Sequence, residues 1–369
     1  MVHQGGVPLN DILHPRPNPI IAAMYTLRDL DVDVIIMHGP AGCGFMASRR
    51  LEEAGVRVIT TGMQENDLIF GAEDKLARIL KKVEEDFRPK LVGIVGTCAS
   101  MIIGENLDGA IKKAGLRAKV IPVDTHGCSG PNTSGAIRTL EVAAERGIIS
   151  NEEFLRQKEM LVRATLIEKD RGITSKQYLE PHPGVTKLTV ALRIVDALRQ
   201  GKRVAVVLNA KKETAYGFAD IMRAMEEARS KLGGEVVHIG NLDPDVGLPR
   251  IRRYARNILR DLEAANVKVV ELTGGLDEYP VAAEKASMLL QQGGYDLRII
   301  AGLPHHLTGL RKDDVLVTDQ PRELRNYIQN GFELSVGEVT THADVMRTDK
   351  VIRNELGNTI REVAEKGYR

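Results

Sequence analysis

The residues best suited to chemistry in this chain are its three cysteines, Cys43, Cys98 and Cys128. Each follows an apolar, strand-like run, in the segments HGPAGCGF, VGIVGTCASMIIG and VIPVDTHGCSG respectively. The carboxyl ends of parallel strands meet at one edge of a sheet, where α/β proteins bind their ligands, so we expect the three thiols at the same edge. Soft thiolates in such a place favour an iron–sulfur cluster, zinc or copper(I).

Glycines beside these cysteines (Gly42, Gly44, Gly96 and Gly127) would let backbone N–H groups approach sulfide atoms without interference from a Cβ. The helices expected to start near Cys43 and Cys98 would lower the pKa of these thiols. The alternative is that the cysteines are ordinary buried core residues, as free cysteines often are. Because their number is odd and no Cys-x-x-Cys occurs, a disulfide framework or a zinc ribbon is poorly supported.

Strand-like runs alternate with helical patterns over most of the chain, which predicts an α/β fold with mainly parallel sheets in two to three Rossmann-like domains. We expect a cluster-binding domain over residues 1–150, a helical connection over 151–200, a second Rossmann-like domain over 201–310 and a C-terminal α/β segment over 311–369. The predicted strands cover 32–37, 56–60, 91–95, 118–123, 204–208, 236–239, 267–272, 296–301 and 314–318.

Composition excludes several classes of function. The 369 residues include 51 Lys and Arg against 50 Asp and Glu, so no charge excess favours nucleic acid. No apolar run approaches the ~20 residues of a membrane span, and the N-terminus does not resemble a secretion signal, so we expect a cytoplasmic protein. The sequence lacks the P-loop pattern Gly-x-x-x-x-Gly-Lys-Ser/Thr and a complete Gly-x-Gly-x-x-Gly, so nucleotide hydrolysis by this chain is not expected.

Three motifs carry a family resemblance. HGPAGCGF, GMQENDLIFGAEDKL and GTCASMIIGENLDGAI, in this order and spacing, resemble the N-terminal domain of nitrogenase component-one subunits and of related cofactor scaffolds and dark-operative protochlorophyllide reductases. The resemblance covers residues 14–130 and implies a component-one-like fold. It matches Cys43 and Cys98 to ligands of the cluster nearest the subunit interface. The family's first cysteine, upstream of HGP, has no counterpart, and Cys128 lies where the family does not usually place a ligand.

The number of thiolate ligands that a cluster needs indicates how many chains would hold it. A [4Fe–4S] cluster commonly takes four thiolates, and one chain offers only Cys43 and Cys98. A two-fold axis places equal patches opposite each other, so we predict one cluster bridging a homodimer. If Cys128 also binds iron, the six thiolates would suit a larger or double cluster.

Within the family, the segment HPRPNPIIAAMYTLRDL and the short chain most resemble the reductive cyclases that convert Ni-sirohydrochlorin a,c-diamide on the way to coenzyme F-430 in methanogens. This resemblance implies a six-electron reduction of a nickel tetrapyrrole with formation of a lactam. It also implies a separate reductase similar to nitrogenase iron protein, which would use the ATP. The alternatives are another nitrogenase-like tetrapyrrole reductase, a non-catalytic scaffold for cofactor assembly, and a sugar- or nucleotide-binding α/β protein.

Candidate proton donors or substrate contacts are few. His126 lies two residues before Cys128, and His305 and His306 lie in GLPHHLTG after a predicted strand. Each is a candidate because imidazole donates protons and binds nickel; the alternative, which the sequence favours, is that each is an ordinary loop histidine. Glu278 and Tyr279 occupy a similar strand-end turn. We interpret His38, in HGP, as a hydrogen-bonded packing residue rather than a ligand.

Overall fold

The computed structural model describes residues 18–127, 130–171, 185–212, 214–277, 283–338 and 348–366. These residues form two compact units, each with a parallel sheet of its own. The cysteine unit comprises residues 18–171 together with 248–250, and the C-terminal unit comprises the other described residues. Cys128, Glu278 and Tyr279 lie outside the described residues.

The sheet of the cysteine unit has four parallel strands in the order β2-β1-β3-β4. Their bounds are Val34–His38 for β1, Arg57–Thr60 for β2, Leu91–Gly96 for β3 and Lys119–Asp124 for β4. Valine and isoleucine dominate the central strands because both faces of this sheet are covered. In the register of β1 and β3, His38 pairs with Gly96, so the two strands end level with each other.

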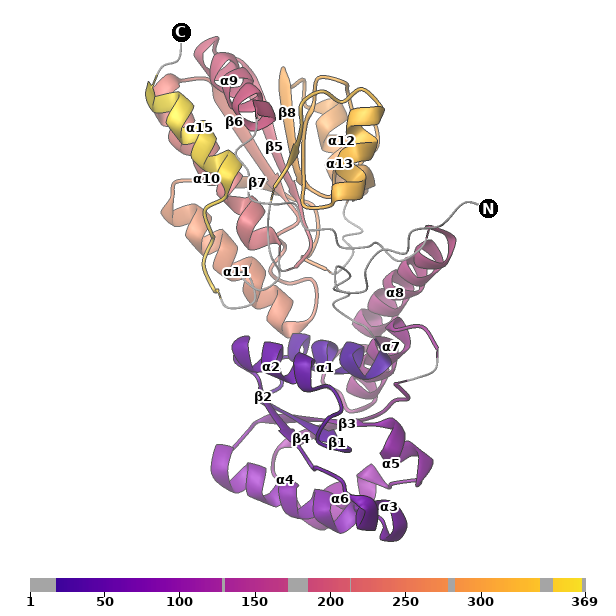
Figure 1. Cartoon of the computed structure of the whole chain (residues 1–369). Coiled ribbons are helices and arrows are strands. Elements are labelled where there is room, and N and C mark those ends of the chain that lie inside the picture. Colours follow the sequence, from indigo (N-terminus) through magenta and orange to yellow (C-terminus); the bar gives the residue numbers. More distant parts are fainter. Residues whose placement is uncertain are drawn as a thin grey trace, which may run out of the picture. The chain divides into compact units, whose positions relative to one another are not determined.

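Helices cover both faces of this sheet (Figure 1). Helices α4 and α6 pack on one face, where Leu76, Leu80, Leu107 and Ala110 join the strands in a buried core. Helices α1 and α7 pack on the other face, and Leu27 of α1 lies so close to Gly93 that a Cβ there would fall 2.6 Å from it. The helices of the unit are α1 (Pro19–Asp29), α2 (Phe45–Glu53), α3 (Glu65–Phe70), α4 (Glu73–Phe87), α5 (Cys98–Ile102), α6 (Leu107–Ala114), α7 (Thr133–Glu145) and α8 (Asn151–Arg171).

The C-terminal unit holds six parallel strands in the order β10-β9-β8-β5-β6-β7. Read from β7, this is the doubly wound order in which the first strand of the unit lies at the centre and the chain winds outwards in both directions. The strands are β5 (Arg203–Asn209), β6 (Glu235–Gly240), β7 (Val269–Leu272), β8 (Leu297–Gly302), β9 (Val315–Thr318) and β10 (Ser335–Gly337). Strands β9 and β10, which come from the segment 311–369, therefore extend the same sheet as β5 to β8.

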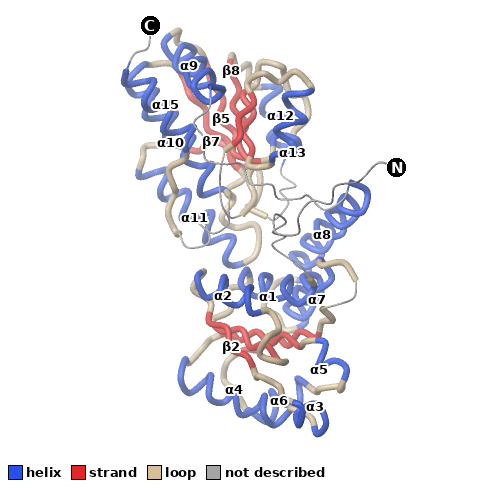
Figure 2. Tube along the Cα trace, in the orientation of Figure 1, coloured by secondary structure: helices blue, strands red, loops and turns tan. Residues whose placement is uncertain are grey.

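Two groups of helices flank this second sheet (Figure 2). On one face α12 and α13 contribute Ala286, Leu290 and Tyr327 to a core with β5, β8 and β9. On the other face α9, α10 and α15 pack against one another. The helices are α9 (Val185–Arg199), α10 (Ala215–Leu232), α11 (Pro249–Ala264), α12 (Ala283–Gln292), the short 3₁₀ helix η2 (Pro304–His306), α13 (Pro321–Gln329) and α15 (Glu355–Lys366).

The predicted fold class is confirmed, since both sheets are parallel and both are covered by helices. Among the described helices, none combines the length and the apolar character needed to cross a bilayer.

Candidate functional site

The two described cysteines flank the switch point of the first sheet. In the order β2-β1-β3-β4 the direction of winding reverses between β1 and β3, and ligands of open α/β sheets bind beyond the carboxyl ends of the strands at such a point. Cys43 lies in the turn that follows β1, and Cys98 begins α5 directly after β3. The structure thus places both thiols at one edge of the sheet.

Close contact between the two turns fixes their relative position. Thr97 donates its backbone N–H to the carbonyl of His38 at 3.2 Å. A Cβ on Gly39 would lie 2.2 Å from Thr97 Oγ1, which is shorter than the non-bonded contacts that Cβ atoms make in proteins. The turn after β1 is closed by a hydrogen bond from Cys43 N to Pro40 O, and Gly44 takes a φ of 71° to start α2. A side chain at residue 39 would therefore push the two cysteine turns apart.

Cys98 already receives an N–H group of the kind that iron–sulfur proteins direct at their ligands. Gly127 N donates to Cys98 Sγ at 3.1 Å, and a Cβ on Gly127 would lie 3.3 Å from the same sulfur and 2.7 Å from Ile20 Cδ1. His126 Nδ1 lies 3.9 Å from Cys98 Sγ, so the chain brings this predicted histidine to the thiol.

The predicted glycines differ in what they do. A Cβ on Gly96 would lie 2.7 Å from Asp124 Oδ1, so the tight end of β3 requires a glycine. Gly44 is required by its positive φ. Gly42 is exposed, and a Cβ there would meet no atom within 4 Å, so packing among the described residues does not require a glycine at this position.

The electrostatics of the thiol pair differ from our expectation. The sequence predicted that helix N-termini lower the pKa of both thiols, yet burial raises the pKa of Cys43 and the nearby Cys98 raises it further. The expectation is wrong for Cys43 because this residue precedes the N-cap Gly44, and burial and the charge of the nearby Cys98 oppose its ionisation. Two neighbouring thiolates repel each other, and a bound metal relieves that repulsion by lowering the pKa of its own ligands.

A buried histidine, His38, is hydrogen-bonded to the carboxylate of Glu105 next to the cysteine turns. His38 is fully buried, and its Nε2 lies 3.1 Å from Glu105 Oε2 while its Nδ1 lies 3.2 Å from Thr61 Oγ1. Glu105 follows α5, and its Oε1 also accepts from Ala72 N at the start of α4. Burial lowers the pKa of His38, although Glu105 opposes this shift. His38, at the end of β1, is thus hydrogen-bonded to the residue that follows β2 and to the segment that follows α5, in agreement with its interpretation as a packing residue.

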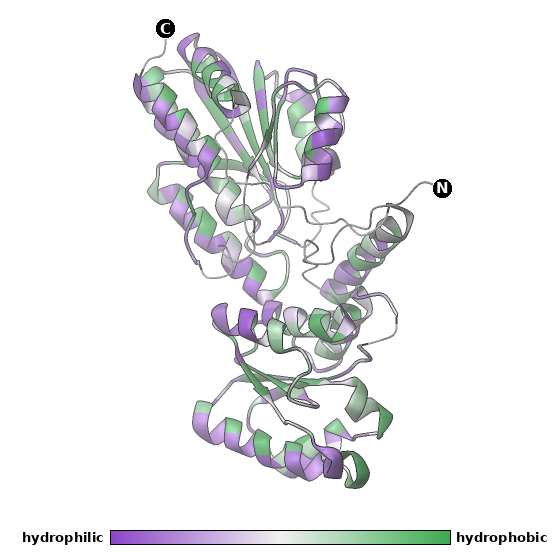
Figure 3. Ribbon diagram, viewed as in Figure 1, coloured by the Kyte–Doolittle hydropathy of each residue, from purple (hydrophilic) through white to green (hydrophobic). Residues whose placement is uncertain are grey.

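Exposed apolar side chains lie on α2 and α5, the helices that follow the two cysteine turns, and on α3; Figure 3 colours the end of α3 and part of α5 green. The largest exposed fractions are 84 % for Phe70, 77 % for Ile102 and 71 % for Ile69. We call the full set the apolar rim; it consists of Phe45, Met46, Leu68, Ile69, Phe70, Met101 and Ile102. Exposed apolar side chains in such number make this part of the chain a candidate interface with another molecule.

The described part of one chain offers two thiols for a metal cluster. Among the described residues no group of three or more His, Cys, Asp or Glu side chains is arranged to hold a metal ion. Cys43 and Cys98 nevertheless have the soft thiolate chemistry of iron–sulfur ligands, lie near each other and are both half-buried. The donor set therefore fits two of the four ligands of a [4Fe–4S] cluster.

His305 and His306 lie in the C-terminal unit, on η2 after β8. Their rings meet edge to face with centroids 4.6 Å apart, and His305 Nδ1 lies 3.1 Å from Tyr327 Oη. Desolvation and the neighbouring His306 lower the pKa of His305, although the residue as a whole is exposed. Both effects favour the neutral form of His305.

Comparison with known proteins agrees with this geometry. The family model described as "Nitrogenase component 1 type Oxidoreductase" matches residues 19–161. The Ni-sirohydrochlorin a,c-diamide reductive cyclase complex component CfbD of Methanothermobacter thermautotrophicus is 48% identical over 358 residues, covering 96% of this chain and 99% of that protein. The same component from Methanosarcina acetivorans is 44% identical over 362 residues, covering 96% and 98%.

The solved structure "Nitrogenase Cp1 at pH 6.5" aligns with 100% of this chain and 96% of its own, at 13% identity and a TM-score of 0.33. The near full-length identity to the curated relatives is decisive. The chain belongs to the nitrogenase component 1 type oxidoreductases, in the family of component CfbD of the Ni-sirohydrochlorin a,c-diamide reductive cyclase complex.

Proposed function

We propose that this chain is the catalytic component of a nitrogenase-like reductive cyclase that acts on Ni-sirohydrochlorin a,c-diamide. The reaction would be a six-electron reduction of the nickel tetrapyrrole with closure of a lactam ring. The observation that carries the proposal is the placement of Cys43 and Cys98 at the switch point of the first sheet. Its support from comparison is the 48% identity over nearly the whole length of a relative that is named for this reaction.

We further propose that Cys43 and Cys98 of two chains hold one [4Fe–4S] cluster across a two-fold axis. When bound, such a cluster supplies electron transfer at low potential. The chain's own contribution is to position the thiols, through the contact of Gly39 with Thr97, and to direct the N–H of Gly127 at Cys98 Sγ. Hydrogen bonds to a ligand sulfur raise the reduction potential by stabilising the more negative state.

The apolar rim supports a second copy of this chain as the partner at the cysteine edge. An exposed pair of apolar residues lies shortly after each cysteine in sequence, Phe45 and Met46 after Cys43, and Met101 and Ile102 after Cys98. A homodimer closed here would bury the rim and complete the ligand set in the same step. Obligate homodimer interfaces are apolar in this way.

Electrons are proposed to come from a separate iron-protein-like reductase that hydrolyses ATP, because the sequence of this chain contains no P-loop motif. Protons must accompany the electrons into the ring. His126 is a candidate because it lies beside Cys98, and His305 and His306 are candidates because they lie at a strand end of the C-terminal unit.

The direct test mixes the anaerobically purified protein with an ATP-dependent iron-protein-like reductase and Ni-sirohydrochlorin a,c-diamide. We expect loss of the substrate absorbance, a product whose mass fits six added electrons and lactam closure, and a strict requirement for ATP. Magnesium and metal-free tetrapyrroles serve as competing substrates. Conversion of one of these in preference to the nickel compound would favour another tetrapyrrole reductase, and binding without any conversion would favour an assembly scaffold.

A further inference from the structure

The C-terminal unit has a switch point of its own, at which loops from two central strands are held together. Its sheet reverses direction between β5 and β8. Leu303 N donates to Asn209 O at 2.8 Å, which ties the loop after β8 to the end of β5. Gly302 takes a φ of 110°, and a Cβ there would lie 2.4 Å from Asn209 O, so the two strand ends are packed as closely as their backbones allow. Ligands bind in α/β sheets of this order at this position.

The side chains at this edge are mostly cationic or imidazole. Lys211 follows β5, His305 and His306 follow β8, and Arg322 follows β9 at the start of α13. His305 is close enough to His306, Lys211 and Arg322 for their charges to lower its pKa, while the buried carboxylate of Glu323 opposes them. Three elements of the unit, the turn after β5, η2 and the start of α13, thus bring the cations Lys211 and Arg322 and the carboxylate of Glu323 to one position.

The type of anion follows from the backbone. A pyrophosphate in a doubly wound sheet is held by a glycine-rich turn after the first strand, because its oxygens need close approach to backbone N–H groups. The turn after β5 reads NAKKETAYG and offers two lysines there instead of glycines. Ammonium and guanidinium groups bind carboxylates through charge-assisted hydrogen bonds that need no such backbone cradle. Carboxylates are therefore favoured over a nucleotide.

We propose that Lys211 and Arg322, beside His305 and His306, form a binding site for the carboxylate arms of the tetrapyrrole at the switch point of the C-terminal unit. This inference rests on the proposed function, because it takes a polycarboxylate tetrapyrrole as the ligand. The neutral form of His305 is favoured, its Nδ1 faces Tyr327, and its Nε2 remains to hydrogen-bond with a ligand. Arg322 donates its Nε to Glu323, which holds the guanidinium in place and leaves its terminal nitrogens to form a fork with a carboxylate.

The test measures binding without turnover. Ni-sirohydrochlorin a,c-diamide is titrated anaerobically into the protein with no reductase and no ATP, and its absorbance is followed. The double variant Lys211→Gln/Arg322→Gln is expected to bind about tenfold more weakly or worse, since two charge-assisted contacts are lost. Lys211→Arg keeps the charge and should retain most of the affinity. Both residues are only half-buried, so the thermal unfolding midpoint and iron content should match the wild type.

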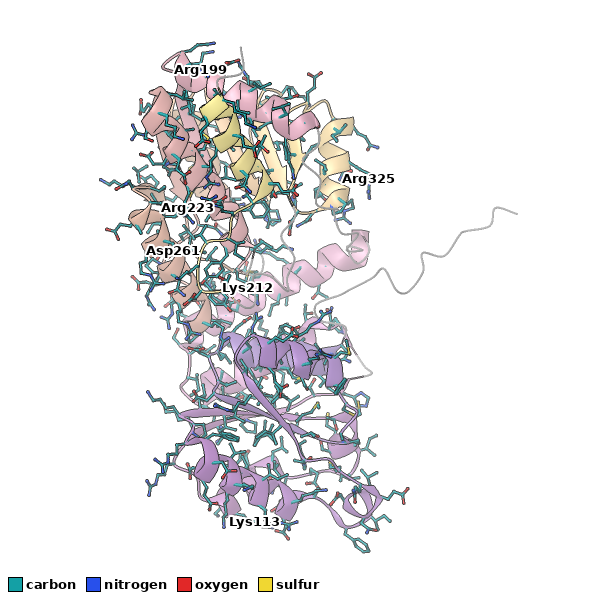
Figure 4. The ribbon with its side chains drawn as sticks, turned by 60° about the vertical axis from the view of Figure 1, so that its left-hand side comes forward. Lys113, Arg199, Lys212, Arg223, Asp261 and Arg325 are labelled. Carbon is teal, nitrogen blue, oxygen red and sulfur yellow. The ribbon has the colours of Figure 1, made fainter. Side chains whose placement is uncertain are left out.

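Arg199 gives the matched control. It is exposed at the end of α9, which leads into the opposite end of β5, and Figure 4 shows it far from Lys212, the neighbour of Lys211. Arg199→Gln should bind the tetrapyrrole like the wild type. Equal weakening by Arg199→Gln would reduce the effect to general electrostatics and overturn the assigned site.

Two further outcomes separate the inference from the proposed function. If the wild type and the double variant bind the nickel tetrapyrrole equally, the inference is wrong and the proposed function stands. If the wild type does not bind the tetrapyrrole at all, the proposed function is wrong, and the inference that rests on it is wrong as well. Inorganic phosphate and ATP are titrated as separate probes, and binding of either that depends on Lys211, with no effect on the tetrapyrrole, would assign the site to a phosphate instead.

Discussion

Phe70 offers a sharp test of the proposed dimer, because it is 84 % exposed in the single chain and lies in the apolar rim. We predict that Phe70→Lys separates the dimer and leaves the fold intact. Residue 70 ends helix α3, where a cationic side chain is tolerated by the helix dipole. An exposed substitution of this kind changes the stability of the single chain by no more than about 0.5 kcal/mol.

The size of the effect follows from the exposed area. A buried aromatic side chain removes about 200 Å² from water, so 84 % exposure leaves roughly 170 Å² available to a partner. At about 25 cal/mol per Å² this is about 4 kcal/mol for each copy, or about 8 kcal/mol for a two-fold dimer, as an upper bound. Even a loss of about 3 kcal/mol weakens the dimer roughly 100-fold.

The assay is anaerobic sedimentation over a range of protein concentrations, with iron counted in each species. Ile328→Lys is the control, because Ile328 is 59 % exposed, lies in the last turn of a short helix and belongs to the other unit. We expect the control to remain a dimer with iron and Phe70→Lys to become a monomer without it. A Phe70→Lys protein with the dimer affinity and iron of the wild type would refute the assignment of the apolar rim to the dimer.

The remaining predictions concern the cysteine turns and one buried histidine. Gly39→Ala should cost about 1–3 kcal/mol through overpacking against Thr97 and lower iron retention; denaturant unfolding with unchanged stability would contradict the tight contact of the two turns. Cys128→Ser should leave iron content and the EPR spectrum largely as in the wild type, and loss of the cluster would make Cys128 a ligand. Burial lowers the pKa of His238 to about 4 in the folded chain. As the pH falls below about 6.5, the unfolded chain therefore protonates its histidine before the folded chain does. The free energy of unfolding is then unaffected by this group above about pH 6.5 and decreases as the pH drops towards 4, by roughly 3 kcal/mol at most. Denaturant titrations at several pH values should therefore show a shallower pH dependence for His238→Gln, and identical slopes would contradict this origin.

Periodicity and residue type were sufficient to predict the main strands. The runs of valine and isoleucine that become β1, β3, β5 and β8 are buried on both faces, so they read as continuous apolar segments bounded by glycine or polar residues. Strand β10 was missed because three residues are too few to show a pattern. Helix α3 was missed because its apolar residues, Leu68–Phe70, point outwards and therefore do not follow the periodicity of a packed helix.

The shared edge of the cysteines was predictable because parallel strands all end on one side. The contact of His38 with Glu105 was not, since 67 residues separate the partners and only the register of β1 and β3 brings them together. The position of Glu105 inside the motif GENLDGA was the one feature of the sequence that could have marked it as part of the site. The raised pKa of Cys43 also depends on tertiary structure, because its direction is set by burial and by the distance to Cys98.

Exposure of the apolar rim was likewise hidden in the sequence. Phe45 and Met46 begin a helix and look like core residues, and only the packed structure shows that they are 63 % and 67 % exposed. Sequence patterns predict which residues are apolar, whereas the surface that remains uncovered depends on how the elements pack.

The most direct measurement counts iron and records EPR spectra for anaerobic dimers of the wild type, Cys43→Ser and Cys98→Ser. The account predicts one cluster of about four iron atoms per two wild-type chains, and loss of the cluster in each variant. A cluster of unchanged spectrum and iron content in either variant, or a full cluster in a monomer, would contradict it.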